Sequence, residues 1–354
     1  MHVPWHTQTV SMKYQVTLPA SGHTFMANDN ETILEAALNA GISLPYGCRG
    51  GRCGACKGKI LKGNVSYQEK PKALTPELEE DQYGLFCQAH ACSDLEIAVD
   101  EIEALEQIKI MKMPTKVARL EQLSHDVMRV FLKLPEAIRM PFFAGQYLDI
   151  IQDNGEHRSF SIANTPHDDQ LIELHIRHVD GGEYTQYIFD RMKVGEILRI
   201  EAPLGSFTLR ESSPRPMILM GGGTGFAPLK GILEHAFKIG LEKPMHLFWG
   251  VRSLRDLYMP DLPLEWSRRF PLFQFTPVLS EPQAEDNWTG ETGFVHEVVM
   301  KHYPDMQNLD IYMSGPPVMV YTARDQFMER GAVESQLFSD AFEYNSQMDK
   351  TGSC

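Results

Sequence analysis

Long apolar runs, a surplus of basic residues and repeats are absent from this 354-residue sequence. No run approaches the roughly 18 apolar residues that a membrane-spanning helix needs. Residues 1–10 lack the basic segment followed by an apolar one that marks an export signal. The sequence has 33 lysines and arginines against 47 acidic residues, and this formal charge of −14 disfavours contact with a nucleic-acid backbone. We therefore expect a soluble cytoplasmic protein with no nucleic-acid or membrane partner.

Six cysteines are present, and they are unevenly placed. Cys48, Cys53 and Cys56 fall close together, Cys87 and Cys92 follow, and the last residue is also a cysteine. In a reducing compartment, clustered thiols bind metals more often than they form disulfides. The sequence therefore predicts one metal centre in the N-terminal third of the chain.

Residues 12–101 show the pattern of a small α+β module. Strands are expected over residues 13–18, 57–61, 65–67 and 95–99. A helix is expected over residues 30–41, with Asn30 as its N-cap and Gly41 at its end. The run Thr75-Pro76-Glu77 has a capping hydroxyl, a proline in the first turn and an acid, and it predicts a second helix start.

The pattern of apolar and turn residues changes twice in the rest of the sequence. From Pro114 to about residue 211, short strand-like segments are separated by turn residues, which predicts an antiparallel β-barrel or sandwich. After Pro216, short apolar strands alternate with helices, which predicts a parallel α/β sheet. The expected fold is thus multidomain, and its parts are an α+β domain over 12–101, a linker over 102–113, the barrel over 114–211, the α/β domain over 212–345 and a tail over 346–354.

The spacing Cys48-x4-Cys53-x2-Cys56, with Cys87 further along the chain, is the plant-type pattern for a [2Fe–2S] cluster. Glycines between these cysteines allow backbone amides to approach the cluster sulfides. A zinc site usually shows two short two-residue clips, and only one is present here. We predict Cys48, Cys53, Cys56 and Cys87 as the ligands of the cluster.

The fourth ligand has an alternative in Cys92. Cys87 is preferred because it follows the apolar pair Leu85-Phe86, which can hold a ligand beside the cluster. Cys92 precedes the polar pair Ser93-Asp94, which indicates a turn. With these motifs, residues 12–101 resemble plant-type ferredoxins of the β-grasp fold, in the version fused to bacterial reductases.

Three short motifs in the barrel region together suit a flavin nucleotide. They are Arg158-Ser-Phe-Ser161, the strand run His175-Ile-Arg177, and Gly181-Gly-Glu-Tyr-Thr185. Arginine can grip a phosphate, an aromatic ring can stack on the isoalloxazine, and a glycine pair opening a helix can present amides to phosphate. These motifs resemble the flavin domain of the ferredoxin–NAD(P) reductase superfamily, whose motif is Arg-x-Tyr-Ser/Thr.

That resemblance implies specific roles in binding FAD. Arg158 would bind the flavin phosphate, Phe160 would stack in place of the usual tyrosine, and Ser161 would lie near the flavin N5. Thr185 would bind phosphate, and the 175–177 run would flank the ring. The flavin-binding residues implied are Arg158, Ser159, Phe160, Ser161, His175, Ile176, Gly181, Gly182, Tyr184 and Thr185.

A glycine-rich turn follows an apolar strand at Gly221–Gly225 and opens a helix, an arrangement that offers free amides to a pyrophosphate. It does not fit the G-x-G-x-x-G register, but GGGTG-x-AP resembles the NAD(P) lobe of the same superfamily. Ser314-Gly-Pro-Pro resembles the family's Cys-Gly-Pro-Pro. The residues implied for NAD(P)H are Gly222, Gly223, Thr224, Gly225, Arg252, Gly315 and Pro316.

Three residues are implied at the reaction centre, namely Ser161, Ser314 and Phe342. Phe342 would shield the flavin, or would instead be ordinary strand core. Arg252 would lie beside the adenosine ribose, or would instead be a solvated arginine after a strand.

The order ferredoxin, flavin, nicotinamide resembles oxygenase reductase components and the subgroup called CDP-6-deoxy-Δ3,4-glucoseen reductases, partners of CDP-6-deoxyhexulose dehydrases. It implies an oxidoreductase that passes electrons from NAD(P)H through FAD and the cluster to a partner protein accepting single electrons. Flavin is needed between the two because nicotinamide gives electrons in pairs and the cluster takes them singly. The alternatives are a free-flavin or ferric reductase and a non-catalytic redox sensor. We expect a monomer.

Overall fold

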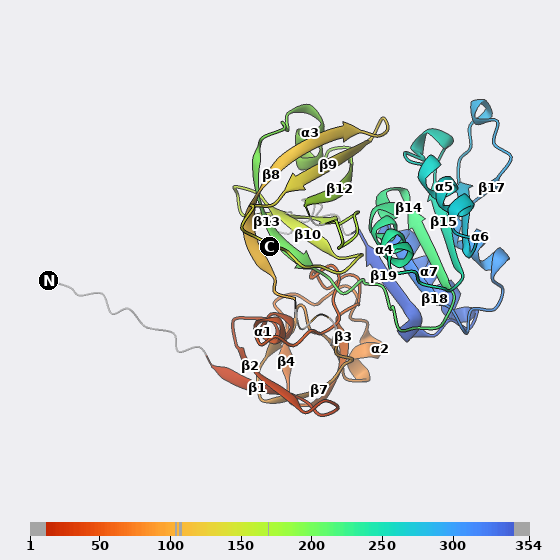
Figure 1. Cartoon of the computed structure of the whole chain (residues 1–354). Helices are drawn as coiled ribbons and strands as arrows, with labels where there is room; N and C mark the ends of the chain where they lie inside the picture. Colours follow the sequence, from red (N-terminus) through yellow and green to blue (C-terminus); the bar gives the residue numbers. More distant parts are fainter. Residues whose placement is uncertain (1–11, 103–104, 106–107, 169, 343–354) are drawn as a thin grey trace, which may run out of the picture. The chain divides into compact units, whose positions relative to one another are not determined.

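The computed structural model of the protein describes residues 12–102, 105, 108–168 and 170–342. These residues divide after Lys109 into two compact units, and each unit is described by itself. Unit 1 is the N-terminal part and unit 2 begins at Ile110 (Figure 1).

Unit 1 is built on a five-stranded mixed sheet with the order β2-β1-β7-β3-β5. Strands β1 and β7 are parallel, whereas the other neighbours are antiparallel. A short ribbon of β4 and β6 completes the unit, together with helices α1 and α2. The bounds are β1 Lys13–Leu18, β2 His23–Asn28, α1 Ile33–Asn39, β3 Lys57–Lys62, β4 Val65–Ser66, α2 Pro76–Glu80, β5 Tyr83–Leu85, β6 His90–Ala91 and β7 Leu95–Ala98.

The N-cap of helix α1 lies two residues later than the sequence suggested, and the expected cap at Asn30 is wrong. Thr32 is the N-cap, because its hydroxyl accepts from the backbone of Glu35 while the Glu35 carboxylate accepts from the backbone of Thr32. This reciprocal capping box satisfies two N-terminal amides at once. Ile33, Leu34, Ala36 and Ala37 then face the core of the unit, directly before the cysteine loop.

Unit 2 contains two six-stranded sheets. The first is antiparallel with the order β11-β10-β13-β8-β9-β12, and it curls around an apolar core. Strand β8 begins inside the expected linker, so strand pairing starts before Pro114. The bounds are β8 Met111–Gln122, β9 Val127–Lys133, β10 Tyr147–Ile151, β11 His157–Ser161, β12 Leu171–Arg177, α3 Glu183–Asp190 and β13 Ile197–Leu204.

The second sheet is parallel with the order β17-β16-β15-β14-β18-β19. Its longer helices are α4, α5, α6 and α7. The bounds are β14 Met217–Gly222, α4 Phe226–Lys238, β15 Met245–Val251, α5 Asp261–Arg269, β16 Phe273–Leu279, β17 Glu291–Thr292, α6 Val295–His302, β18 Asp310–Gly315, α7 Pro317–Glu329 and β19 Leu337–Ala341.

The two faces of this sheet are covered by different helices because successive side chains of a strand alternate. On β14, Met217 and Leu219 pack with residues of α4 and α5, whereas Ile218 and Met220 pack with residues of α6 and α7. Both faces are therefore buried, which explains the continuous apolar runs of the central strands.

We call the antiparallel sheet of β8 to β13 with α3 the barrel, and the parallel sheet of β14 to β19 with its helices the lobe. A buried network of charges joins the barrel to the lobe. The carboxylate of Glu173 on β12 accepts from Lys230 Nζ of α4 at 3.2 Å and from Arg129 Nε of β9 at 2.9 Å. His175 donates from Nε2 to Glu173 at 2.8 Å and accepts at Nδ1 from the Tyr258 hydroxyl at 3.0 Å. The side chains of Glu173 and Lys230 are only 6% and 4% exposed, so their charges have little access to water.

This network sets the ionisation of Glu173. Burial by itself would raise the pKa of Glu173, but the hydrogen bond from His175 and the charge of Lys230 hold it well below its usual range. Lys230 also donates to the backbone oxygen of Ala163 and to Glu234, so its three donors all have partners. The network is fully satisfied only when barrel and lobe are docked as observed.

We expect Glu173→Gln to destabilise unit 2 by about 3 to 5 kcal/mol, because it leaves buried cations without their counter-charge. The midpoint of urea unfolding, followed by the fluorescence of the buried residues Trp249 and Trp266, measures the loss. Lys301→Met breaks the exposed pair with Glu291 and serves as the control, with an expected loss below about 1 kcal/mol. Equal effects of the two variants would contradict the importance of the network.

Candidate functional site

The cysteine loop of unit 1 lies between α1 and β3, and its thiols form two pairs. Cys56 Sγ lies 3.1 Å from Cys87 Sγ, which follows β5. Cys48 and Cys53 form the other pair, because each accepts at Sγ from the backbone N–H of the other at 3.4 to 3.5 Å. The described cysteines are free thiols. The predicted ligands Cys48, Cys53, Cys56 and Cys87 are thus brought together.

Backbone amides point at these sulfurs, as an anionic cluster requires. Gly50 donates to Cys48 Sγ at 3.4 Å. The pKa of Cys48 is lowered to about 6 by the hydrogen bond from Cys53 and by backbone amides of the loop. Gly51 has φ of +70°, and a Cβ at that position would lie 2.7 Å from Pro71 Cβ. Both the backbone conformation and the lack of space therefore exclude a side chain at this position.

The division into pairs distinguishes between metal centres. Among the described residues, no three of these sulfurs lie within 4.8 Å of one another. A tetrahedral zinc ion needs all its ligands around one point. Two irons with two thiolates each suit two separate pairs. The thiol arrangement therefore fits a [2Fe–2S] cluster, whereas Cys92 is exposed and contacts the backbone oxygen of His90.

In unit 2, the motif Arg158-Ser-Phe-Ser161 occupies β11. Arg158 pairs with Glu156 at 2.8 Å, and Ser159 donates to Asp149 at 2.6 Å. The ring of Phe160 lies 6.4 Å from the ring of Tyr184, whose hydroxyl is buried without a hydrogen-bond partner. An orphaned phenol beside an aromatic face and a cation is a feature that a bound flavin nucleotide could satisfy.

The start of α3 offers further donors. Gly182 caps the helix without a side-chain hydrogen bond, and Gly181 has φ of +75° with open space where a Cβ would stand. The hydroxyl of Thr185 turns back into this turn, accepting from Val179 N–H at 3.1 Å and donating to Gly182 O at 3.0 Å. The amides of the turn, with Arg158, fit a flavin phosphate; Thr185 fits the role of holding the turn in shape.

The run 175–177 on β12 divides its side chains between different tasks. His175 and Ile176 are buried, and the imidazole of His175 is committed to Glu173 and Tyr258. Arg177 instead donates from Nε to Asp126, a barrel residue between β8 and β9, at 2.7 Å. A Cβ on Gly223 would lie 3.2 Å from Arg177 Nη1, so this guanidinium lies beside the glycine-rich turn.

Barrel and lobe meet at Asp340 on β19. Ser161 donates to Asp340 Oδ2 at 2.8 Å, and Ser314 at the end of β18 lies 3.5 Å from the same oxygen. Phe342 donates its N–H to Gly315 O at 2.9 Å. Ser161 and Ser314 are thus joined by one carboxylate, and Phe342, the third residue predicted at the reaction centre, is held by its backbone beside Ser314. Sequence reasoning missed Asp340, although it lies two residues before the predicted Phe342.

A cavity of about 560 Å³ opens at the carboxyl ends of β14 and β15. Open α/β sheets bind their ligands at this edge. Of the residues predicted for NAD(P)H, the cavity is lined by Gly222, Gly223, Thr224, Arg252 and Pro316.

Gly225 and Gly315 lie outside the cavity lining and allow close packing behind it. A Cβ on Gly225 would lie 2.0 Å from the backbone oxygen of Ser314, and Gly315 has φ of +141°.

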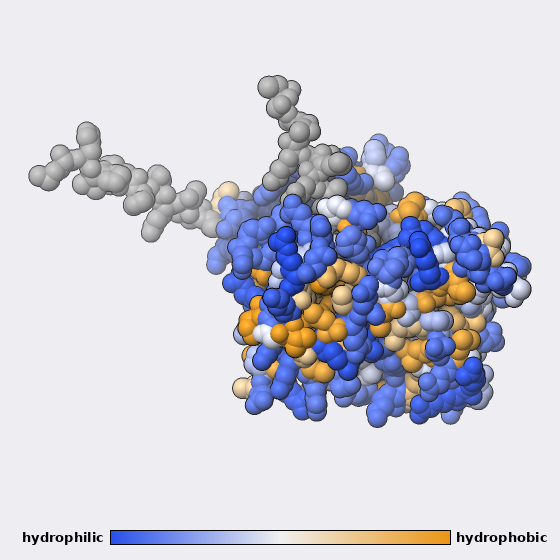
Figure 2. Space-filling model, turned by 90° about the horizontal axis from the view of Figure 1, so that it is seen from above, coloured by the Kyte–Doolittle hydropathy of each residue, from blue (hydrophilic) through white to orange (hydrophobic). Residues whose placement is uncertain are grey.

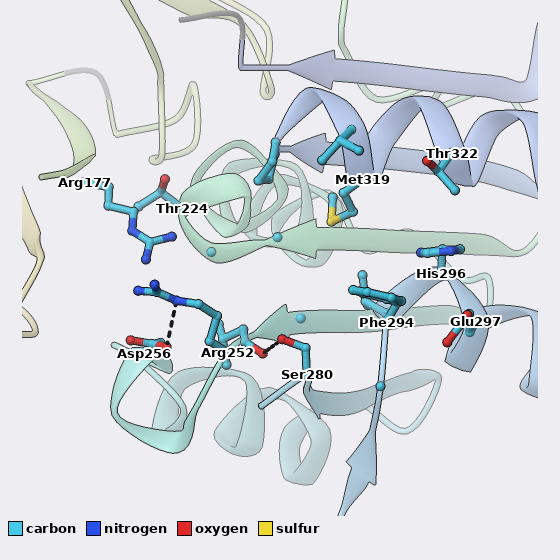
Figure 3. A pocket seen from close by; sticks show the side chains of 18 of the residues that line it. Arg177, Thr224, Arg252, Asp256, Ser280, Phe294, His296, Glu297, Met319 and Thr322 are labelled. Carbon is cyan, nitrogen blue, oxygen red and sulfur yellow. Dashed lines mark hydrogen bonds and ion pairs between the residues drawn. The ribbon is translucent and has the colours of Figure 1, made fainter. Parts of the chain in front are cut away.

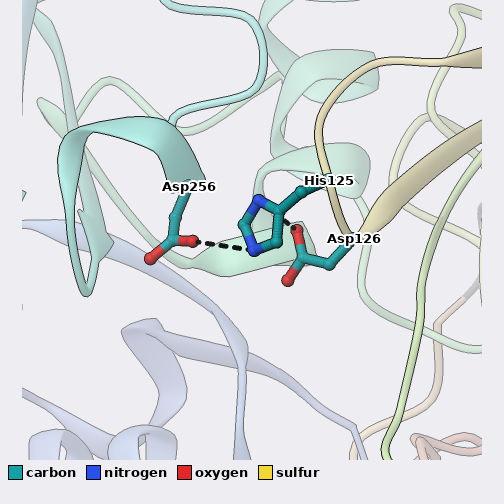
Figure 4. Close-up of side chains that lie close together, drawn as sticks. All are labelled: His125, Asp126 and Asp256. Carbon is teal, nitrogen blue, oxygen red and sulfur yellow. Dashed lines mark ion pairs between the residues drawn. The ribbon is translucent and has the colours of Figure 1, made fainter.

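One end of the cavity is strongly charged. Arg177 and Arg252 point toward each other there, and each is held by an aspartate, Asp126 at 2.7 Å and Asp256 at 3.7 Å (Figure 3). His125 lies between the two carboxylates, 3.8 Å from Asp126 and 3.6 Å from Asp256, and so bridges barrel and lobe (Figure 4). Each arginine uses Nε for its aspartate, which leaves its terminal nitrogens for a phosphate-bearing ligand.

The opposite end is lined by residues that sequence reasoning missed, among them Phe294 and His296 at the start of α6. No glycine-rich or charged motif marks these residues in the sequence. The one available signal is an aromatic residue directly after Gly293.

Family models match most of the chain. A 2Fe-2S iron-sulfur cluster binding domain matches residues 16–92, an oxidoreductase FAD-binding domain matches 114–209, and an oxidoreductase NAD-binding domain matches 219–325. In the described part of the chain, no helix combines the length and apolarity needed to cross a membrane. The predicted fold class and the predicted cofactors are confirmed by these matches.

Similar proteins cover nearly the whole chain. A CDP-6-deoxy-L-threo-D-glycero-4-hexulose-3-dehydrase reductase of Yersinia pestis is 37% identical, with 94% of this chain and 99% of that protein covered. The terephthalate 1,2-dioxygenase reductase component 1 of Comamonas sp. is 33% identical, with 94% and 98% covered.

Among solved structures, an Amycolatopsis cytochrome P450 reductase has a TM-score of 0.79 at 31% identity, covering 94% of this chain and 100% of that one. With three matching domain models and relatives similar over this length, the chain belongs to the family of flavin-dependent NAD(P)H oxidoreductases that carry an N-terminal [2Fe–2S] ferredoxin domain.

Proposed function

We propose that the protein takes electrons from NAD(P)H in unit 2 and delivers them singly, through the cluster of unit 1, to a partner protein. The observation that carries this proposal is the division of the four thiols into two pairs, in the same chain as a dinucleotide cavity. The first centre suits one-electron transfer, and the second binds a two-electron donor.

The proposed domains are those expected from the sequence, residues 12–101, 114–211 and 212–345, with 102–113 as the linker. Cys48, Cys53, Cys56 and Cys87 would hold the cluster. The family-model matches and the division of the structure after Lys109 are compatible with these limits.

FAD would be held by the β11 motif and the start of α3. Phe160 and Tyr184 would pack against the ring system, and Arg158 with the amides of the α3 turn would bind phosphate. Bound there, the flavin supplies the conversion between paired and single electrons. The chain itself contributes position, since rigid strands of the barrel hold these side chains.

NAD(P)H would bind with its pyrophosphate on the amides of Gly222–Thr224, between the guanidinium groups of Arg177 and Arg252. Its nicotinamide would then approach Ser314 and the barrel residue Ser161. Both hydroxyls are oriented by Asp340, and Phe342 would cover this place. No side chain here needs to act as a nucleophile; the residues orient the reactants and exclude water.

Asp340 has an ionisation suited to this task. Burial raises the pKa of Asp340 to about 6, although hydrogen bonds from Ser161 and Ser314 lower it in part. Above that pH, the carboxylate accepts from Ser161 and holds its hydroxyl in one direction. Below it, the protonated carboxyl competes as a donor, and the hydroxyl of Ser161 loses its fixed orientation.

The proposed partner is an electron-accepting dehydrase or oxygenase component, because relatives similar over nearly the whole chain are named as reductases of such enzymes. The proposed compartment is the cytoplasm, which the free thiols of the described cysteines support. We further propose that the protein acts as a monomer.

A free-flavin reductase is a second candidate, and the ion pair between Arg158 and Glu156 favours it because it occupies the expected phosphate ligand. We expect FAD to remain bound through repeated dilution and filtration. Loss of the flavin to the filtrate with unchanged NAD(P)H oxidation on added flavin would instead support the second candidate.

Cys87→Ser is expected to abolish electron delivery to cytochrome c while leaving NAD(P)H–ferricyanide activity intact, because ferricyanide can be reduced before the cluster. Iron and acid-labile sulfide should fall with it. Cys92→Ser is the matched control and should keep both activities and both elements. A cluster lost from the Cys92 variant and retained in the Cys87 variant would make Cys92 the fourth ligand.

Asp340→Asn is expected to slow NAD(P)H oxidation about ten- to a hundredfold, because Ser161 loses its charged acceptor. It should also stabilise the fold at pH 8. The pKa of Asp340 is higher in the folded chain, so the folded state binds the proton more tightly and the wild type loses stability as pH rises through 6.

The stability advantage of this variant in urea unfolding should therefore shrink by about 1 to 2 kcal/mol between pH 8 and pH 5. Asp325→Asn, which removes an exposed carboxylate 65% accessible to water, should change neither quantity. An advantage that stays constant over this pH range would refute the assigned ionisation.

A further inference from the structure

The end of the cavity away from the arginines carries two exposed apolar side chains. Phe294 and Val318 line it, and their exposed fractions of 64% and 75% are among the highest of the large apolar residues in the described chain. Apolar residues on the face seen in Figure 2 lie among polar ones, as on most proteins. These two differ because both line one cavity, Phe294 at the N-cap of α6 and Val318 in the first turn of α7.

The same end contains an unsatisfied imidazole. His296 is only 6% exposed, lines the cavity, and has a buried Nδ1 with no hydrogen-bond partner. Its ring lies 5.9 Å from the ring of Phe294 at an interplanar angle of 19°. Burial lowers the pKa of His296, so the ring is neutral near pH 7. A buried polar atom without a partner calls for a ligand atom that supplies one.

Charge decides which part of a dinucleotide fits there. In the described part of the cavity lining, the arginines lie at the end near Thr224, and Glu297 lies beside His296 at the other end (Figure 3). A carboxylate without a basic side chain beside it repels phosphate. The groove therefore suits an uncharged, planar group with apolar faces and a polar edge.

We propose that His296 is a specificity-determining residue that hydrogen-bonds through Nδ1 to the edge of the adenine base, while the base stacks on Phe294. This rests on the proposed use of NAD(P)H. The cavity is continuous from the glycine-rich turn to α6, so pyrophosphate bound at Gly223 places the adenosine half along it. The nicotinamide half then extends the other way, toward Ser314.

The test uses the full-length holoprotein and isothermal titration with ADP-ribose, which lacks nicotinamide. His296→Leu should weaken ADP-ribose binding about two- to tenfold, the value of one hydrogen bond. His296→Asn should restore it, because the asparagine amide places a polar atom where Nδ1 stands, whereas His296→Gln should not. Phe294→Ala should weaken binding about 5- to 150-fold through lost stacking.

A second readout separates recognition from a general structural effect. Reduced nicotinamide mononucleotide lacks adenosine, so its kcat/KM with ferricyanide should be unchanged in the His296 variants while that of the dinucleotide falls. His302→Asn, at the far end of α6, is the matched control and should change ADP-ribose affinity less than twofold.

Unaltered ADP-ribose affinity in His296→Leu, or equal losses for the dinucleotide and the mononucleotide, would overturn the inference. These results leave the proposed function standing. A wild-type protein that neither binds ADP-ribose nor oxidises either nicotinamide donor would instead contradict the proposed function itself.

Discussion

The buried carboxylate of Glu173 is the interaction on which the catalytic unit depends. It lies on the barrel, yet one of its partners, Lys230, belongs to the first helix after the glycine-rich turn. A buried charge is tolerated only with its partners in place. The same contacts that stabilise the docked arrangement therefore set the position of the glycine-rich turn relative to β11. They also set the separation of Ser161 on the barrel from Ser314 on the lobe.

From that docking follow two shared sites that neither half of unit 2 forms alone. Asp340 of the lobe receives a hydrogen bond from Ser161 of the barrel, and Arg177 of the barrel lies beside Gly223 of the lobe. Flavin and nicotinamide chemistry both need such shared walls, because the two ligands must approach each other while water is excluded. Burial at this shared wall raises the pKa of Asp340, so keeping the carboxylate ionised lowers the stability of the fold. Functional sites commonly give up some stability in this way.

The local features were largely predictable, for reasons that can be traced to particular residues. The strands β14 and β18 are short apolar runs bounded by turn residues, and their parallel pairing was expected from the helices between them. The cap at Asn30 was mispredicted because Thr32 and Glu35 form a capping box, in which each side chain accepts from the backbone of the other. Asn30, the first polar residue of the segment, does not form this pair. Helix α5 lacked a capping signal, since its N-cap is Pro260. The side chain of His175 could not be placed, because its partner Tyr258 is 83 residues away.

By itself, the sequence determined the chemistry that each segment can carry: thiols at cluster spacing, an arginine and an aromatic residue on one strand, and glycines after another. These features depend on residues close together in the chain, and for such residues the spacing in the sequence largely fixes their distance in the structure. Only the tertiary structure decided that the thiols divide into two pairs, that Asp340 joins Ser161 to Ser314, and that His296 faces the cavity with a free nitrogen. Such contacts join residues far apart in sequence, and they are chosen by burial and hydrogen bonding over the whole unit.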